Sequence, residues 1–187
     1  MSRDLVRRVH RWSGLVLAIP LLVAGLTGAA ISFHHELDRW LAPAQFVVEP
    51  RGPALPADAL LRELRRAWPA ATPGYVRLPQ RPDDALVVDL AEPVRTPQGA
   101  TWTTVFVDPY DARVLGGRDE YGWRVDRLHL MPLLYRLHYT LGAGDVGRWM
   151  MGLAAAAWTL TGLLGLVLAV PRWRLLKRSL SIRRRGK

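Results

Sequence analysis

Hydrophobic positions gather in two long runs, one near each end of the chain. Residues 12–33 and 149–170 each form a run of 22 residues without a charged side chain. About 20 apolar residues are enough for a helix to cross the hydrocarbon core of a bilayer. The first run is longer than the apolar region of a cleaved signal peptide, and transmembrane helices tolerate a proline such as Pro20. The pattern therefore predicts two retained transmembrane helices.

Between the runs, the pattern is that of a soluble domain with one helix and several strands. Residues 55–71 place Leu60, Leu64 and Trp68 on one face of a helix, with the charged residues mostly on the other. Short apolar stretches bounded by turn residues predict strands over 44–50, 74–79, 85–92 and 101–109 and a hairpin over 108–117. Residues 125–141 predict a helix too short and too charged to be a third span. We therefore expect a membrane α-helical protein with an inserted α+β domain.

The net charge of +10 is concentrated just outside the two apolar runs. Residues 1–11 hold four Arg and one Asp, residues 172–187 hold eight Lys and Arg, and residues 36–148 hold 14 Arg against 15 acids. Basic residues that flank spans mark the cytoplasmic side, so both termini are expected in the cytoplasm. Basic and aromatic residues share no patch, which argues against nucleic acid as a partner. The absence of cysteine excludes disulfides, thiolate catalysis and iron–sulfur clusters.

These patterns divide the chain into six segments. They are the cytoplasmic N-terminus (1–11), the first transmembrane helix (12–35), the central domain (36–122), an interfacial helix with a Gly-rich link (123–145), the second transmembrane helix (146–171) and a basic cytoplasmic tail (172–187). With both termini in the cytoplasm, the central domain and the interfacial helix are expected on the outer side.

Three of the five histidines lie at the rims of the first span. On one continuous helix, His10 and His35 would be only about 20° apart around the axis and about 37 Å apart along it. His34 would point away from both. Small residues line the face between His10 and His35, among them Gly14, Gly25 and Gly28. Such a face admits either another helix or a flat cofactor held by a rim histidine.

The two remaining histidines, His129 and His138, are nine residues apart and would face opposite sides of one helix. By the expected topology, His138 and His35 both lie at the outer rim. Two imidazoles from different helices suit haem iron, whereas a bare metal ion favours carboxylates or a His pair at i, i+4. The spacing leaves two hypotheses open, namely haem ligands or interfacial histidines without a ligand role.

The sequence resembles the PepSY-associated transmembrane proteins over nearly its whole length. The first helix of that family begins H-R-W-x-G and ends near T-G, and its last part combines L-H, G-R and a second T-G. The matching residues here are His10, Arg11, Trp12, Gly14, Thr27 and Gly28, followed by Leu137, His138, Gly147, Arg148, Thr161 and Gly162. In the stretch that resembles the PepSY strand–turn–strand signature, Asp111 and Ala112 replace the usual Thr-Gly.

The resemblance implies an inner-membrane protein with a periplasmic PepSY-like domain and haem b, since some larger members act as ferric siderophore reductases. It implies haem ligation by His10 and His138, whereas His34, His35 and His129 lie outside the core motif. Larger members have four spans, so two copies of this chain are expected to form a homodimer. No dinucleotide fingerprint is present in the sequence, so the electron donor is expected to be quinol or a separate reductase.

Several assignments remain open at this stage. The candidate cofactor-binding residues are His10, His34, His35, His129, His138, Gly14, Gly25 and Gly28, with the haem iron assigned to His10, His35 and His138. His35 or His34 could face His138 at the outer rim, and His10 from both subunits could hold a second haem at the inner rim. The alternative function is a non-enzymatic, membrane-anchored binding protein that regulates a peptidase or another envelope partner, because PepSY domains also resemble inhibitory propeptides.

Overall fold

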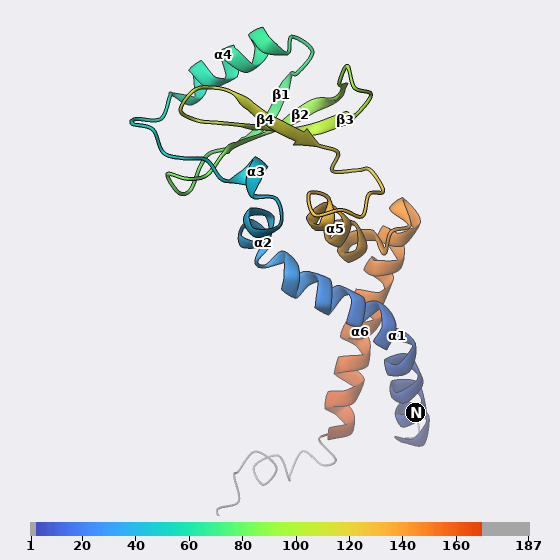
Figure 1. The fold of residues 1–187 in the computed structure, drawn as a ribbon. Helices are drawn as coiled ribbons and strands as arrows, with labels where there is room; N and C mark the ends of the chain where they lie inside the picture. Colours follow the sequence, from blue (N-terminus) through green and yellow to red (C-terminus); the bar gives the residue numbers. More distant parts are fainter. Residues whose placement is uncertain (1–2, 170–187) are drawn as a thin grey trace, which may run out of the picture. The chain divides into compact units, whose positions relative to one another are not determined.

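The computed structural model describes residues 3–169, which form six helices and four strands (Figure 1). The elements are α1 (Arg3–Ile31), α2 (His34–Leu41), α3 (Pro43–Phe46), α4 (Ala57–Ala67), β1 (Pro73–Arg77), β2 (Leu86–Arg95), β3 (Thr101–Val107), β4 (Val114–Arg118), α5 (Leu130–Thr140) and α6 (Gly144–Ala169). The predicted basic tail lies outside the described residues.

The chain divides into two compact units, which are described separately below. The helical unit comprises Met1–Thr27 and Arg136–Lys187, and the sheet unit comprises Gly28–Tyr135. Two helices, over Asp4–Ile31 and Gly144–Leu166, are long and apolar enough to cross a membrane. The prediction of two transmembrane helices with an inserted α+β domain is therefore confirmed.

The first helix ends earlier than predicted. The last turn of α1 tightens, because the Phe33 amide donates to the Ala30 carbonyl. The Ser32 hydroxyl also donates to the Gly28 carbonyl at 3.0 Å, a local bond that competes with continued helix. After this turn, His34 and His35 lie on α2. The prediction that one continuous helix carries both His10 and His35 on one face is therefore wrong.

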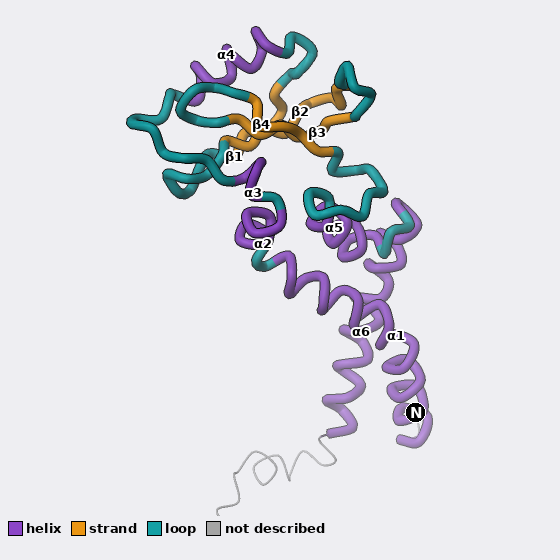
Figure 2. The backbone as a smooth tube through the Cα atoms, in the orientation of Figure 1, coloured by secondary structure: helices purple, strands orange, loops and turns teal. Residues whose placement is uncertain are grey.

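The sheet unit is built on a four-stranded antiparallel sheet in the order β1-β2-β3-β4 (Figure 2). Leu60 and Leu64 of α4 pack on Val88, Val105 and Val107 to form the main core, as the periodicity of residues 55–71 predicted. The predicted strands over 74–79, 85–92 and 101–109 correspond to β1, β2 and β3, and the hairpin corresponds to β3 with β4. Between Asp89 and Val94 of β2, the pairing with β3 shifts register and leaves a bulge.

Two local predictions differ from the structure. The strand predicted over 44–50 is replaced by α3, because Pro43 suits a first helical position and Phe46 is drawn into a second core, 4.6 Å from the Phe106 ring. The helix predicted from residue 125 begins only at Leu130. The Asp126 carboxylate accepts the His129 amide at 3.0 Å, so it caps the helix there.

Candidate functional site

His10 lies on α1 with its ring against α6, inside the helical unit. Its Nδ1 is 3.0 Å from the Thr161 carbonyl oxygen. Because a carbonyl oxygen only accepts hydrogen bonds, Nδ1 carries the hydrogen, and in the neutral ring the lone pair is on Nε2. Gly165 makes room for this ring, since a Cβ atom there would be 3.0 Å from His10 Cε1.

His138 on α5 is held in the same manner against α1. Its Nδ1 is 3.0 Å from the Ala24 carbonyl oxygen and 3.2 Å from Thr27 Oγ1. The Thr27 hydroxyl donates to the Val23 carbonyl at 2.6 Å, so it accepts from the histidine. Nδ1 of His138 is therefore also the protonated nitrogen, and Nε2 is the atom available to a metal.

The structure brings the sequence motifs together crosswise. His10 of the first motif meets Thr161 of the second T-G pair, and His138 meets Thr27 of the first T-G pair. The contacts at residues 10 and 24 of α1 are separated by about 21 Å of helix. Two axial ligands of one iron would be only about 4 Å apart, given metal–nitrogen bonds of about 2 Å. Within one chain, His10 and His138 therefore belong to two separate levels.

An apolar groove of about 560 Å³ lies between α1 and α6 in the helical unit. It is lined by α1 residues between Val16 and Val23, by Leu141 and by α6 residues between Met150 and Ala157. Apart from the thioether sulfur of Met150, which is a possible ligand of haem iron, these side chains supply no metal ligand, so the groove provides mainly apolar surroundings between the two histidine levels.

Of the face predicted on α1, His10 contacts α6, whereas the glycines Gly14 and Gly25 do not. A Cβ atom at Gly14 or Gly25 would meet nothing within 4 Å, whereas the buried side chains of α1 are those of Val6, Leu17 and Thr27. Packing against α6 therefore does not account for the small residues. Their role beside a cofactor stays a prediction, as does that of Gly28, whose carbonyl accepts the Ser32 amide and hydroxyl.

His34 and His35 lie in the sheet unit. His35 Nε2 is 3.4 Å from Asp84 Oδ1. Asp84 also pairs with Arg39 and accepts the backbone amides of Gln80 and Arg81 at 3.0 and 2.8 Å. The ring of His34 contacts that of Tyr135 edge-on, with 6.4 Å between centroids. Asp84 thus holds the loop, whereas His35 Nε2 is buried beside it without a hydrogen-bond partner, and the ligand role of His35 stays a prediction.

His129 is buried in the sheet unit and bonded to its helix cap. Its Nδ1 is 2.6 Å from Asp126 Oδ1. Burial acts to raise the pKa of Asp126, but the hydrogen bonds from His129 outweigh this effect and leave the pKa below its ordinary value. This geometry explains His129 as part of the start of α5.

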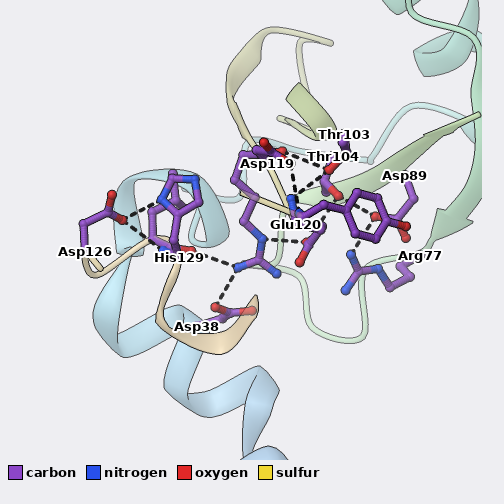
Figure 3. A network of polar contacts seen from close by, with 12 residues as sticks. Asp38, Arg77, Asp89, Thr103, Thr104, Asp119, Glu120, Asp126 and His129 are labelled. Atoms are coloured by element: carbon purple, nitrogen blue, oxygen red, sulfur yellow. Dashed lines mark hydrogen bonds and ion pairs between the residues drawn. The ribbon is translucent and has the colours of Figure 1, made fainter. Parts of the chain in front are cut away.

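A buried ion-pair network that the sequence did not reveal joins α2, the end of β4 and the segment before α5 in the sheet unit (Figure 3). Arg118, with 4% of its side chain exposed, donates to Asp38 at 2.9 Å and to Glu120 at 2.7 Å. It also donates to the Leu128 carbonyl at 3.2 Å. Burial raises the pKa of Asp38 by more than the Arg118 charge lowers it. Burial also acts to lower the pKa of Arg118, but the two carboxylates outweigh it, so the pKa of Arg118 is raised.

A polar cavity of about 510 Å³ lies beside this network, next to the β2 bulge. His34, Asp38, Arg77 and Glu120 are among its lining residues. Arg77 donates to Asp89 at 3.0 Å, yet its Nε is buried without a hydrogen-bond partner. Over residues 3–169, no group of three or more His, Asp or Glu side chains converges as a metal site. The assignment of a cofactor to the histidines of the helical unit stays a prediction.

Comparison with known proteins supports the family resemblance. A search of curated proteins gives no match. The model of the family described as the PepSY-associated TM region matches residues 7–187, which include both long helices and the sheet unit. The chain therefore belongs to the PepSY-associated TM region family.

Proposed function

We propose that this protein carries haem b and transfers electrons to Fe(III) or a ferric siderophore on the periplasmic side of the bacterial inner membrane, for iron uptake. The observation that carries the proposal is that two histidines share the same hydrogen-bonding arrangement. His10 and His138 each fix Nδ1 on a backbone carbonyl of another helix. Metal-bound histidines commonly donate the second ring nitrogen in this way, which fixes the tautomer and orients the ring.

The surroundings of both histidines also suit haem. Both rings lie in the helical unit with apolar helices on either side, and that unit presents neither thiolates nor carboxylate clusters as competing ligands among its described residues. Haem b held by two imidazoles would supply one-electron transfer between ferric and ferrous iron, without an open position for oxygen chemistry. The chain's own contribution is to orient the two rings and to exclude water from them.

Within the helical unit, each histidine level holds one imidazole, and a second copy of the chain would supply the other. In a twofold-symmetric dimer, a residue that lies at the axis meets its own counterpart from the other copy, and we place His10 and His138 there. His10 of both copies would then form one level and His138 of both copies the other. The open positions at Gly14 and Gly25 leave space for the flat cofactor or the second copy.

His10 and His138 would hold the haem, and a separate donor, either quinol or a reductase, would supply the electrons. Reduction of one Fe(III) consumes one electron and yields Fe(II). Chelators with hard oxygen ligands hold Fe(II) less tightly than Fe(III), so this step would release iron. Lipid would contact the remaining outward faces of the two helices that are long and apolar enough to cross a membrane.

Absorption spectra of the full-length protein, purified from haem-replete cells, test this proposal. We expect a Soret band and sharp bands in the dithionite-reduced state. His10→Ala and His138→Ala should each remove about half of the haem, because the levels are separate, whereas His34→Ala should retain all of it. Loss of haem in His34→Ala alone would reassign the ligands. A colourless wild-type protein would refute the proposal and favour the anchored regulatory protein.

A further inference from the structure

Helix α2 is amphipathic, but its polar side is buried in the sheet unit and its apolar side is exposed. Its polar residue Asp38 is buried, whereas Trp40 is 77% exposed and Phe33, the residue that caps the helix, is 63% exposed. At 100° per residue, Phe33, Leu37 and Trp40 fall within about 60° of one another around the axis. One side of α2 therefore presents two aromatic rings outward, with the half-buried Leu37 between them.

The opposite side of α2 is fixed inward by ion pairs within the sheet unit. Asp38 binds Arg118 at 2.9 Å, Arg39 binds Asp83 at 2.6 Å, and His35 lies 3.4 Å from Asp84. The Arg39 pair holds the pKa of Asp83 below its ordinary value. Rotation of the apolar side into the domain would break all of these contacts, so its outward position is set by the fold.

The position of α2 in the chain identifies what covers this side. Phe33 lies two residues after Ile31, the last residue of a helix long and apolar enough to cross a membrane. Two residues of extended chain reach at most about 7 Å, so Phe33 cannot be far from the membrane surface. Tryptophan is enriched at that interface, and helices with one apolar side lie in its plane.

An ion pair offsets the negative charge at the edge of this apolar side. Glu36 lies about 60° from Phe33 around the axis and pairs with Arg81 at 3.8 Å. A paired carboxylate repels anionic headgroups less than a free one does.

We propose that the outward side of α2, formed by Phe33, Leu37 and Trp40, is a lipid-binding surface that inserts into the headgroup region of the bilayer. The insertion places two aromatic rings at the level where the hydrocarbon core ends, with the helix axis in the plane of the membrane. This proposal does not depend on haem binding.

Site-directed spin labelling tests the proposal, and the chain favours it because the sequence contains no cysteine. Phe33→Cys and Trp40→Cys would be labelled with a nitroxide in the full-length protein, reconstituted into nanodiscs of phosphatidylethanolamine and phosphatidylglycerol. Tyr75→Cys is the matched control, because Tyr75 lies in the same unit and is 65% exposed. Power saturation would compare the access of oxygen, which partitions into lipid, with that of a water-soluble nickel chelate.

Labels at residues 33 and 40 should favour oxygen over the nickel chelate, and the label at residue 75 should show the opposite. Equal access of the nickel chelate at all three positions would overturn the proposal. Protection of residues 33 and 40 from both reagents would also overturn it, because a protein partner would then cover this side. If Trp40→Cys fails to fold, Phe33→Cys and Leu37→Cys report the same surface.

Discussion

Arg118 should be the side chain whose loss most destabilises the sheet unit. Arg118→Met keeps much of the apolar stem and removes the charge. The variant loses charge-assisted hydrogen bonds to Asp38 and Glu120, and the stacking of the guanidinium 5.3 Å from the Phe46 ring and 5.7 Å from the Phe106 ring. Glu120 is a quarter exposed and regains water, whereas Asp38 is only 3% exposed and does not.

The magnitude follows from the carboxylate that is left behind. Removal of one partner of a buried ion pair typically costs about 3–5 kcal/mol, because the other charge stays buried without compensation. This is a large fraction of the roughly 5–15 kcal/mol that stabilises a typical domain. Replacement of both partners by apolar groups is often nearly neutral, so Asp38→Leu combined with Arg118→Met should recover much of the loss. Arg113→Met is the control, because Arg113 is 66% exposed and lies 3.9 Å from Asp108 and Asp111.

Hydrogen exchange followed by mass spectrometry measures the effect in the full-length protein, through the opening free energy of the β2 and β3 amides. Arg118→Met should lower this free energy by about 3–5 kcal/mol, and Arg113→Met by less than about 1 kcal/mol. A loss below about 1 kcal/mol in Arg118→Met, or a double variant no more stable than the single one, would refute the reasoning.

Two further predictions concern single contacts. Gly165→Val should displace His10, whose Cε1 is 3.0 Å from the added Cβ, and should halve the haem content. Gly162→Val is the control, because a Cβ there meets nothing within 4 Å, and it should leave the haem content unchanged. Equal haem in both would contradict this. Asp126→Ala should cost the start of α5 about 1 kcal/mol at neutral pH. Because folding lowers the pKa of Asp126, its contribution is complete above the unfolded-state value of about 3.9 and is lost as pH falls through the folded-state pKa. Exchange protection of residues 130–133 should therefore fall in acid for the wild type and stay flat for Asp126→Ala.

Local sequence patterns were sufficient to predict the helices and strands whose buried residues follow from the spacing of apolar positions. The apolar stripe of residues 55–71 and the short apolar stretches over 85–92 and 101–109 correspond to observed elements. The strand prediction for residues 44–50 is wrong because the sequence "FVV" suits a strand as well as a buried turn. The helical turn that begins at Pro43 is favoured only once Phe46 packs in the core.

The candidate site depended on contacts between distant residues. The motif histidines were visible in the sequence, but their crosswise meeting with Thr27 and Thr161 requires the tertiary structure. From the sequence, Arg118 resembles an ordinary surface arginine, because no neighbouring residue pattern indicates that residues 38, 120 and 128 surround it. The predicted direction of His35 around the helix axis is wrong, because a serine-containing turn ends α1 at Ile31 before His35 is reached.

The ratio of haem to protein tests the central claim most directly. Two histidine levels, each completed by a second copy, require one haem b for each chain. A pyridine haemochrome assay on the full-length protein from haem-replete cells should give this ratio, and His10→Ala combined with His138→Ala should abolish it. Wild-type protein without haem, or a double variant that retains the full haem content, would contradict the account.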